Sequence, residues 1–238
     1  MFGLIGILWS FATLPSFWLV TPARNMSERI LMDDRPKPGA LSDILVRIEQ
    51  QPHPVLLQPE LGQAEALIRL RAAEEAIEQK PTDEADRAVA IAANKLRFGL
   101  SMNPANGFLW LMLYSVATVS SGFDPSNIRH LGQSYVTAPL DGWIALRRNR
   151  LGLAVFPMLS GAMQENAVSE FASLVDSGFI DDAAISLTST GWAQRERLLV
   201  SLERVDIVQR VAFVKRLLRD GVKAAVPGVE IDERPWRR

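Results

Sequence analysis

The sequence predicts an all-α protein with one N-terminal transmembrane helix followed by an α-helical domain. Three observations carry this prediction. No charged residue occurs from Phe2 to Ala23. From Gly62 onward, apolar residues recur at the spacing of one helix face, and prolines or glycines separate the periodic segments. No stretch alternates apolar and polar residues for long enough to indicate a strand.

Composition limits the class of protein. The 238 residues are 48% hydrophobic and 22% charged, which is typical of a folded globular chain. The formal net charge of −1 offers no basic excess, so we expect no nucleic acid partner. Cysteine is absent, which excludes disulfides and thiolate metal sites.

Residues 2–20 are apolar over a length close to that of a bilayer core, about 30 Å. We predict that residues 1–23 form a transmembrane anchor. Two alternatives remain open: a cleaved signal peptide ending near Thr21-Pro22-Ala23, and a buried first helix. No basic residue precedes the run and several follow it, which favours a cytoplasmic domain. The very short N-terminus favours an exported one instead.

The elements follow in order along the chain. Residues 24–62 are predicted to be a connector with one short helix, 43–50, capped by Ser42. Residues 63–225 are predicted to be one repeat-like helical domain, in which Asp124 and Pro125 open one of the helices. Residues 226–238 lack periodicity and should be irregular. Helices are expected over 63–80, 83–102, 107–120, 125–136, 141–156, 164–177, 180–189, 193–202 and 205–220.

Part of this pattern resembles the tetratricopeptide repeat. Pro104 and Pro139 each end a helix and lie about one repeat length apart, roughly 34 residues. Ahead of Pro104, a small–large–small pattern is formed by Ala92, Leu96 and Gly99. The resemblance extends over about residues 83–156, and it implies that Trp110 fills a socket made by these three residues.

A second resemblance is at the level of sequence segments. AEALIRLRAAE, NPANGFLWLMLYSV, GFDPSNIRHLGQSY and GWIALRRNRLGLAVF resemble a group of uncharacterised bacterial membrane-anchored proteins that accompany exopolysaccharide biosynthesis genes. The resemblance implies a role in the cell envelope and an exported domain, and it brings no catalytic residue. We therefore expect a single-pass inner-membrane protein whose helical domain is periplasmic.

Motifs for enzymatic chemistry are missing from the sequence. There is no glycine-rich phosphate loop and no His-Glu-x-x-His zinc motif. The two histidines, His53 and His130, are far apart in sequence, and His130 is interpreted as a partly exposed helical residue. Asp181 and Asp182 are interpreted as first-turn residues that stabilise a helix N-terminus. We predict no catalytic residue, no metal and no cofactor.

Arginines provide the candidate binding surface. Arg148 interrupts an apolar stripe made by Leu140, Ile144, Leu151 and Val155. In one interpretation, an anionic polysaccharide or acidic peptide binds a surface formed by Trp143, Arg147, Arg150 and Tyr135. In the other, Arg147 and Arg150 are solvated and Arg148 pairs with a carboxylate of a neighbouring helix. A later arginine series, from Arg195 to Arg219, is interpreted as solvated helix surface.

The function expected from these observations is that of a non-enzymatic, membrane-anchored scaffold or adaptor. Its partners would be other envelope or polysaccharide-assembly proteins, with residues 2–20 contacting the membrane. The alternative is a periplasmic module that binds a saccharide or another small ligand. Its stacking residues would then be Trp110, Tyr135 and Trp143. An enzyme is the third hypothesis.

Overall fold

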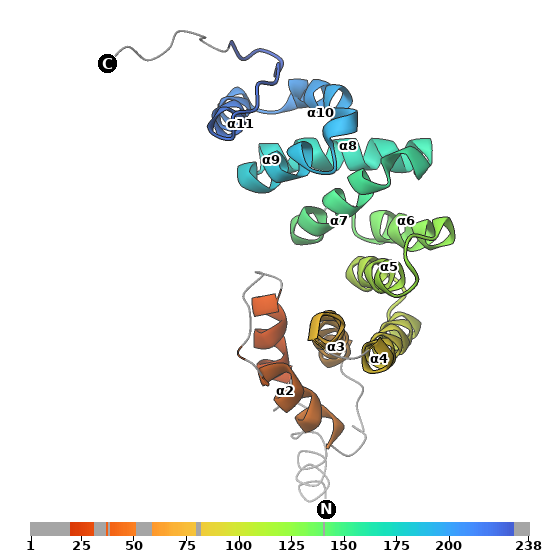
Figure 1. Ribbon diagram of the computed structural model, residues 1–238. Helices are drawn as coiled ribbons and strands as arrows, with labels where there is room; N and C mark the ends of the chain where they lie inside the picture. The colour runs from red at the N-terminus through yellow and green to blue at the C-terminus, as the bar shows by residue number, and fades with distance from the viewer. Residues whose placement is uncertain are drawn as a thin grey trace, which may run out of the picture. The chain divides into compact units, whose positions relative to one another are not determined.

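The computed structural model describes residues 20–30, 37, 39–50, 59–79, 82–139 and 141–230. Within these ranges the chain forms α-helices and short 3-10 helices, and it contains no strand (Figure 1). The prediction of an all-α protein is therefore confirmed for the described residues. The chain divides into two compact units, Met1–Thr137 and Ala138–Arg238.

The first unit is a series of helices in which each packs on the next. Contacts join α2 to α3, α3 to α4, α4 to α5 and α5 to α6, and α3 also reaches α5. Its elements are α2 (Ala40–Glu49), α3 (Pro59–Gln79), α4 (Thr82–Met102), α5 (Gly107–Ser121), η1 (Pro125–Asn127) and α6 (Ile128–Thr137). The mostly buried α5 supplies much of the core, because its sequence FLWLMLY is apolar all round.

The second unit is organised around α8, which contacts α7, α9, α10 and α11. At its centre the rings of Phe171 and Phe213 meet edge to face, with centroids 5.9 Å apart. Its elements are α7 (Gly142–Ala154), η2 (Phe156–Met158), α8 (Gly161–Asp176), α9 (Ile180–Thr188), η3 (Trp192–Gln194), α10 (Arg195–Ser201), η4 (Leu202–Arg204) and α11 (Ile207–Arg219). An irregular segment follows α11 to Glu230, in agreement with the predicted tail as far as the described residues extend.

Side-chain caps fix several of the helix starts. The Asp124 carboxylate accepts a hydrogen bond from the Ser126 amide at 2.8 Å, and Pro125 follows it as the first residue of η1. This is the start that the sequence predicts. Asn106 caps α5, Ser160 caps α8 and Asp206 caps α11 in the same way.

The predicted connector is more helical than expected. Residues 20–30 form a helix, and α3 begins at Pro59 rather than at residue 63. The cap of α2 also differs, because Gly39 takes the N-cap position with φ of 85°. Ser42 then lies inside the first turn, where its hydroxyl donates to the Gly39 carbonyl at 2.8 Å. A residue with positive φ is favourable only as glycine, which explains the choice of start.

The expected localisation, a single-pass inner-membrane protein with a periplasmic domain, is contradicted. In the ranges that the structure describes, no helix is both long enough and apolar enough to cross a membrane. Of the predicted anchor, residues 1–19 lie outside the described residues. The helix at 20–30 is polar, with Arg24 donating to Glu28 at 3.0 Å.

Packing between α4 and α5 differs from the repeat-like prediction by one residue. A Cβ placed on Gly99 would lie 3.0 Å from Cδ1 of Leu109, which is 1% exposed. Trp110 makes no such contact and is only half-buried. The prediction that Trp110 fills the socket is therefore wrong for the position beside Gly99. Leu109 of α5, and not Trp110, packs against Gly99 of α4. Membership of the tetratricopeptide class stays a prediction.

Candidate functional site

Arg148 is a packed, paired residue, as the second interpretation of the arginine cluster predicts. Its side chain is 0% exposed, and its Nε and Nη2 both donate to Glu170 Oε1 on α8, at 2.9 and 2.5 Å. The adjacent Asn149 donates to the Ala167 carbonyl at 2.7 Å. These hydrogen bonds join α7 to α8. The buried Arg148 side chain is therefore not accessible to a ligand.

The residues predicted around Arg148 differ in accessibility. Trp143 is 48% exposed, Arg150 is exposed and Arg147 is half-buried, all on α7. Tyr135, on α6 of the first unit, is 4% exposed. Its inclusion in a solvent-facing stacking surface is therefore wrong, because the side chain is buried. Leu140 lies outside the described residues.

Trp110 stacks on a histidine. Its ring centroid lies 5.7 Å from that of His130, with 17° between the planes. Its Nε1 donates to the Pro104 carbonyl at 2.8 Å. Burial lowers the pKa of His130, and the charges of Arg129 and Arg97 lower it further. One face of the Trp110 ring is thus occupied by His130, and the position suits packing better than saccharide stacking.

The second unit contains an open apolar groove, here called the α10 groove. One side is lined by Trp192, Arg195, Leu199 and Val200, and the other by residues 223–227, which follow α11. Its volume is about 640 Å³, which is in the range of ligand sites. Figure 1 shows the segment after α11 running toward α10.

One face of η3 and α10 forms the first wall, because its residues recur at helical spacing. Leu199 is 8% exposed and lies deep, whereas Trp192 is 41% and Val200 64% exposed. The guanidinium carbon of Arg195 lies 5.1 Å from the centroid of the Trp192 ring, and its Nη1 donates to the Trp192 carbonyl at 3.2 Å. The cation is thus held over the aromatic ring.

The second wall is a segment outside any helix, and hydrogen bonds hold both of its ends. At its start, the Val222 amide donates to the Leu217 carbonyl at 2.9 Å. At its end, Arg210 Nη1 donates to the Pro227 carbonyl at 2.5 Å. Gly228 follows with φ of 73°, and a Cβ there would lie 2.9 Å from the same Nη1. A Cβ at this position would displace the end of the Arg210 side chain, and the positive φ itself favours glycine.

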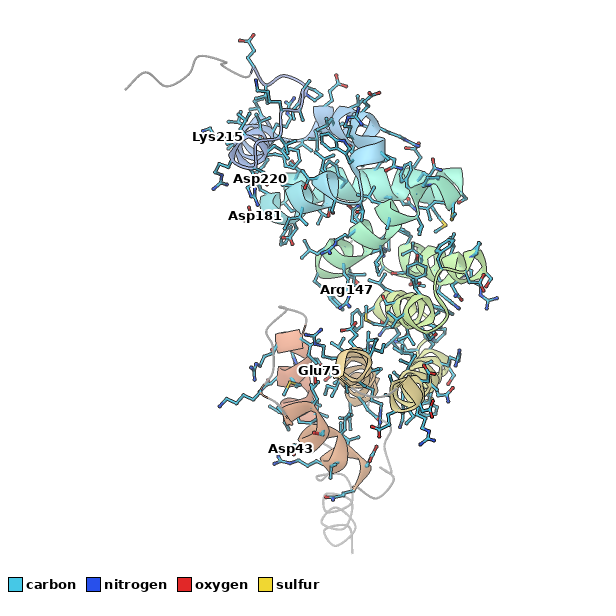
Figure 2. All side chains as sticks on the ribbon, viewed as in Figure 1. Asp43, Glu75, Arg147, Asp181, Lys215 and Asp220 are labelled. Atoms are coloured by element: carbon cyan, nitrogen blue, oxygen red, sulfur yellow. The ribbon has the colours of Figure 1, made fainter. Side chains whose placement is uncertain are left out.

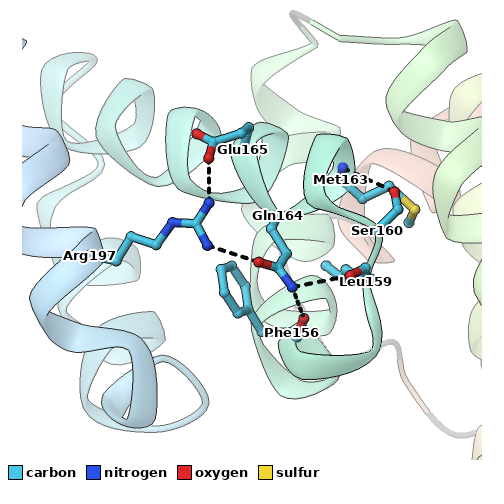
Figure 3. A network of polar contacts seen from close by, with 7 residues as sticks. All are labelled: Phe156, Leu159, Ser160, Met163, Gln164, Glu165 and Arg197. Atoms are coloured by element: carbon cyan, nitrogen blue, oxygen red, sulfur yellow. Dashed lines mark hydrogen bonds and ion pairs between the residues drawn. The ribbon is translucent and has the colours of Figure 1, made fainter.

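A polar network holds α10 against α8 on the side away from the groove. Arg197 donates to Gln164 Oε1 at 2.8 Å and to the Glu165 carboxylate, and its guanidinium lies over the Phe156 ring (Figure 3). Gln164 in turn donates to the carbonyls of Phe156 and Leu159. Both arms of the network fix the position of α10, and with it the groove wall.

An ion-pair cluster plays a similar part between α9 and α11. Arg216 pairs with Asp181 at 2.5 Å and with Asp220, and Figure 2 shows the two carboxylates close together. Asp181 and Asp182 lie in the first turn of α9, as the sequence predicts. Arg197 and Arg216 therefore join helices, although the sequence pattern indicates plain solvated surface.

Sequence reasoning missed the α10 groove entirely. Trp192 and Arg195 share a short helical segment, but their second wall comes from residues that sequence periodicity marks only as a tail. The signal that the sequence offers is a tryptophan, Trp192, three residues before an arginine, Arg195. Among the described residues, no group of three or more acidic or histidine side chains could hold a metal ion.

Comparison with known proteins finds no family model, no curated protein and no solved structure that matches this chain.

Proposed function

We propose that the protein is a non-enzymatic helical adaptor and that a partner protein binds it at the α10 groove. The groove is the observation that carries this proposal. Its wall exposes Trp192 and Val200, and it holds Arg195 in a fixed position. Tryptophan and arginine are among the residues enriched at the energetic centres of protein interfaces.

The class of partner follows from the resemblance of the chain to proteins that accompany exopolysaccharide genes. On that basis the partner belongs to the machinery that assembles or exports a polysaccharide. A helical array suits this role because it offers side chains from several helices to another protein without any catalytic group.

A saccharide ligand is the second candidate, since the exposed ring of Trp192 could stack on a sugar. The position of Arg195 favours a protein partner over a saccharide. Its guanidinium lies over the ring at 5.1 Å, where a sugar ring would have to lie. The remaining groove wall is largely apolar, with Leu199, Val200 and Val226.

Site-specific crosslinking in the native cells tests the proposal. A photoreactive amino acid replaces Val200 in the groove or, as a matched control, Val208 on α11, which is 68% exposed and outside the groove. We expect a discrete crosslinked protein from position 200 and none from position 208. Equal patterns from both positions, or no crosslink at 200, would contradict the proposal.

A further inference from the structure

We infer that the α10 groove takes an extended peptide segment that carries a bulky apolar side chain next to an acidic one. This inference rests on the proposed adaptor function and names the chemistry of the partner. Three features of the groove support it: its apolar floor, its unpaired cation and its open backbone.

The floor accepts an apolar side chain. Leu199 and Val226 are 8% and 4% exposed and lie at the base, and the more exposed Val200 and Trp192 stand at the rim. A volume of about 640 Å³ is ample for one large aliphatic or aromatic side chain together with its backbone. Burying such a side chain removes apolar area of both partners from water, which favours binding.

The positive charge of Arg195 determines that the residue next to the apolar one in the peptide is acidic. Arg195 has no carboxylate partner among the described residues, and its position over Trp192 is already fixed. Little side-chain entropy is then lost when it binds an acid. The groove lining contains two basic residues, Arg195 and Lys223, against one acidic residue, Glu196. An acidic side chain is therefore favoured over a basic one.

The backbone of the second wall defines the conformation. Residues 222–226 belong to no helix or strand, and among the described residues no backbone hydrogen bond involves Ala224 or Ala225. Ala225 is exposed, and its small side chain leaves room for another strand. An extended peptide can pair with such a segment through main-chain hydrogen bonds, as in binding by strand addition.

Calorimetric titration of the full-length chain with defined peptides tests the inference. The probe is a short acetylated and amidated peptide with phenylalanine flanked by aspartates. Three matched probes replace the aspartates by lysines, replace the phenylalanine by alanine, or methylate the amide nitrogens around the phenylalanine. We expect the parent probe to bind and each matched probe to lose about tenfold or more in affinity.

Two variants locate the binding. Arg195→Glu should reverse the preference, so that the lysine probe binds better than the aspartate probe. Val200→Glu should abolish binding of the parent probe, while Val208→Glu, at an equally exposed valine outside the groove, should leave it unchanged. Unchanged circular dichroism melting establishes that each variant is folded. An Arg195→Glu variant that keeps the original preference would overturn the assignment of the acid.

The C-terminal segment of the chain itself is the competing occupant. If it filled the groove, Trp236→Ala would strengthen binding of the parent probe, and that result would overturn the assignment of a partner peptide. Failure of all probes together with a persistent crosslink from position 200 would overturn the peptide class and leave the adaptor function standing. Loss of the crosslink together with binding of the probes would overturn the adaptor function alone.

Discussion

Arg148 and Glu170 form a charged pair inside the second unit, with side-chain exposures of 0% and 6%. Taking either charge out of water is costly, and the cost is offset only while the partner is present. The pair also fixes the position of α7 along α8, because Arg148 Nε and Nη2 both donate to the same carboxylate oxygen of Glu170.

Removing one member of this pair should therefore be strongly destabilising. We expect Glu170→Ala to lower the free energy of unfolding by about 3–5 kcal/mol, since it leaves the Arg148 charge buried without its carboxylate. The double variant Arg148→Met, Glu170→Leu should recover much of that loss. Urea denaturation measures both.

The exposed pair Arg197–Glu165 is the matched control, with side-chain exposures of 41% and 72%. Because water screens these charges, Glu165→Ala should cost less than about 1 kcal/mol. A similar loss at both pairs would mean that Arg148 is hydrated in solution.

Leu109 and Trp110 allow a second test at the scale of single residues. Leu109 is 1% exposed and packs on Gly99, so Leu109→Ala should cost about 2–5 kcal/mol. Trp110 is half-buried, and Trp110→Ala should cost less than Leu109→Ala despite the larger side chain. Thermal melts of the two variants rank them. The reverse order would restore the socket that the repeat-like pattern implies for Trp110.

At the scale of elements, α5 and α6 meet through the Trp110–His130 stack, which makes their packing sensitive to pH. The pKa of His130 lies below its ordinary value of 6.5 because of burial and the neighbouring Arg129 and Arg97. The unfolded chain then binds the proton more readily than the folded one. Stability should therefore fall as the pH drops through about 6.5 toward the lower folded pKa.

We expect the free energy of unfolding to decrease between about pH 7.5 and about pH 5.5, and His130→Phe to remove part of that decrease. The phenyl ring keeps the stacking partner of Trp110 but carries no titratable group. Denaturation curves of both proteins at the two pH values give the change in the free energy of unfolding with pH. Carboxylates titrate in both proteins, so the difference between the two changes isolates His130. An identical pH dependence would show that His130 titrates equally in the folded and unfolded chain.

The segment after α11 that forms the second wall of the groove allows another test at the scale of elements. At Gly228, φ is 73° and a Cβ would approach Arg210 Nη1 to 2.9 Å. Gly228→Ala should therefore push the Arg210 guanidinium away from the Pro227 carbonyl and weaken binding at the groove, while the melting temperature changes little because the turn is on the surface. Gly221, also with positive φ but with no atom near its Cβ position, is the control. If alanine at Gly221 and alanine at Gly228 weakened binding equally, backbone strain at positive φ would explain the loss, and the contact with Arg210 would not.

Helices were largely predictable, because apolar periodicity and the Pro, Gly, Asn and Asp signals are local. The bounds of α4, α5 and α9 agree with the sequence to within a residue or two. The 3-10 turns η2, η3 and η4 were not predicted, since period and composition do not separate them from the ends of α-helices. The structure begins α2 earlier than the sequence predicts, because Gly39 and not Ser42 takes the N-cap position.

Across the whole molecule, the sequence predicts local structure better than sites. The sequence predicts the pairing of Arg148 as one of two interpretations, because an arginine in an apolar stripe needs a carboxylate. Tyr135 is buried although the sequence predicts exposure, because helical periodicity alone does not show which residues of α6 other elements cover. The α10 groove combines η3 and α10 with residues 223–227, and no local pattern joins such segments.

In the proposed function, a partner protein binds at the α10 groove. Hydrogen–deuterium exchange of the full-length chain, alone and with the protein captured by crosslinking from position 200, tests it most directly. We expect slower exchange in residues 192–200 and in residues 223–227 together, because one bound segment contacts both walls. Protection that avoids both segments and appears instead around the exposed Ile91, Phe98 and Met102 of α4 would contradict the claim.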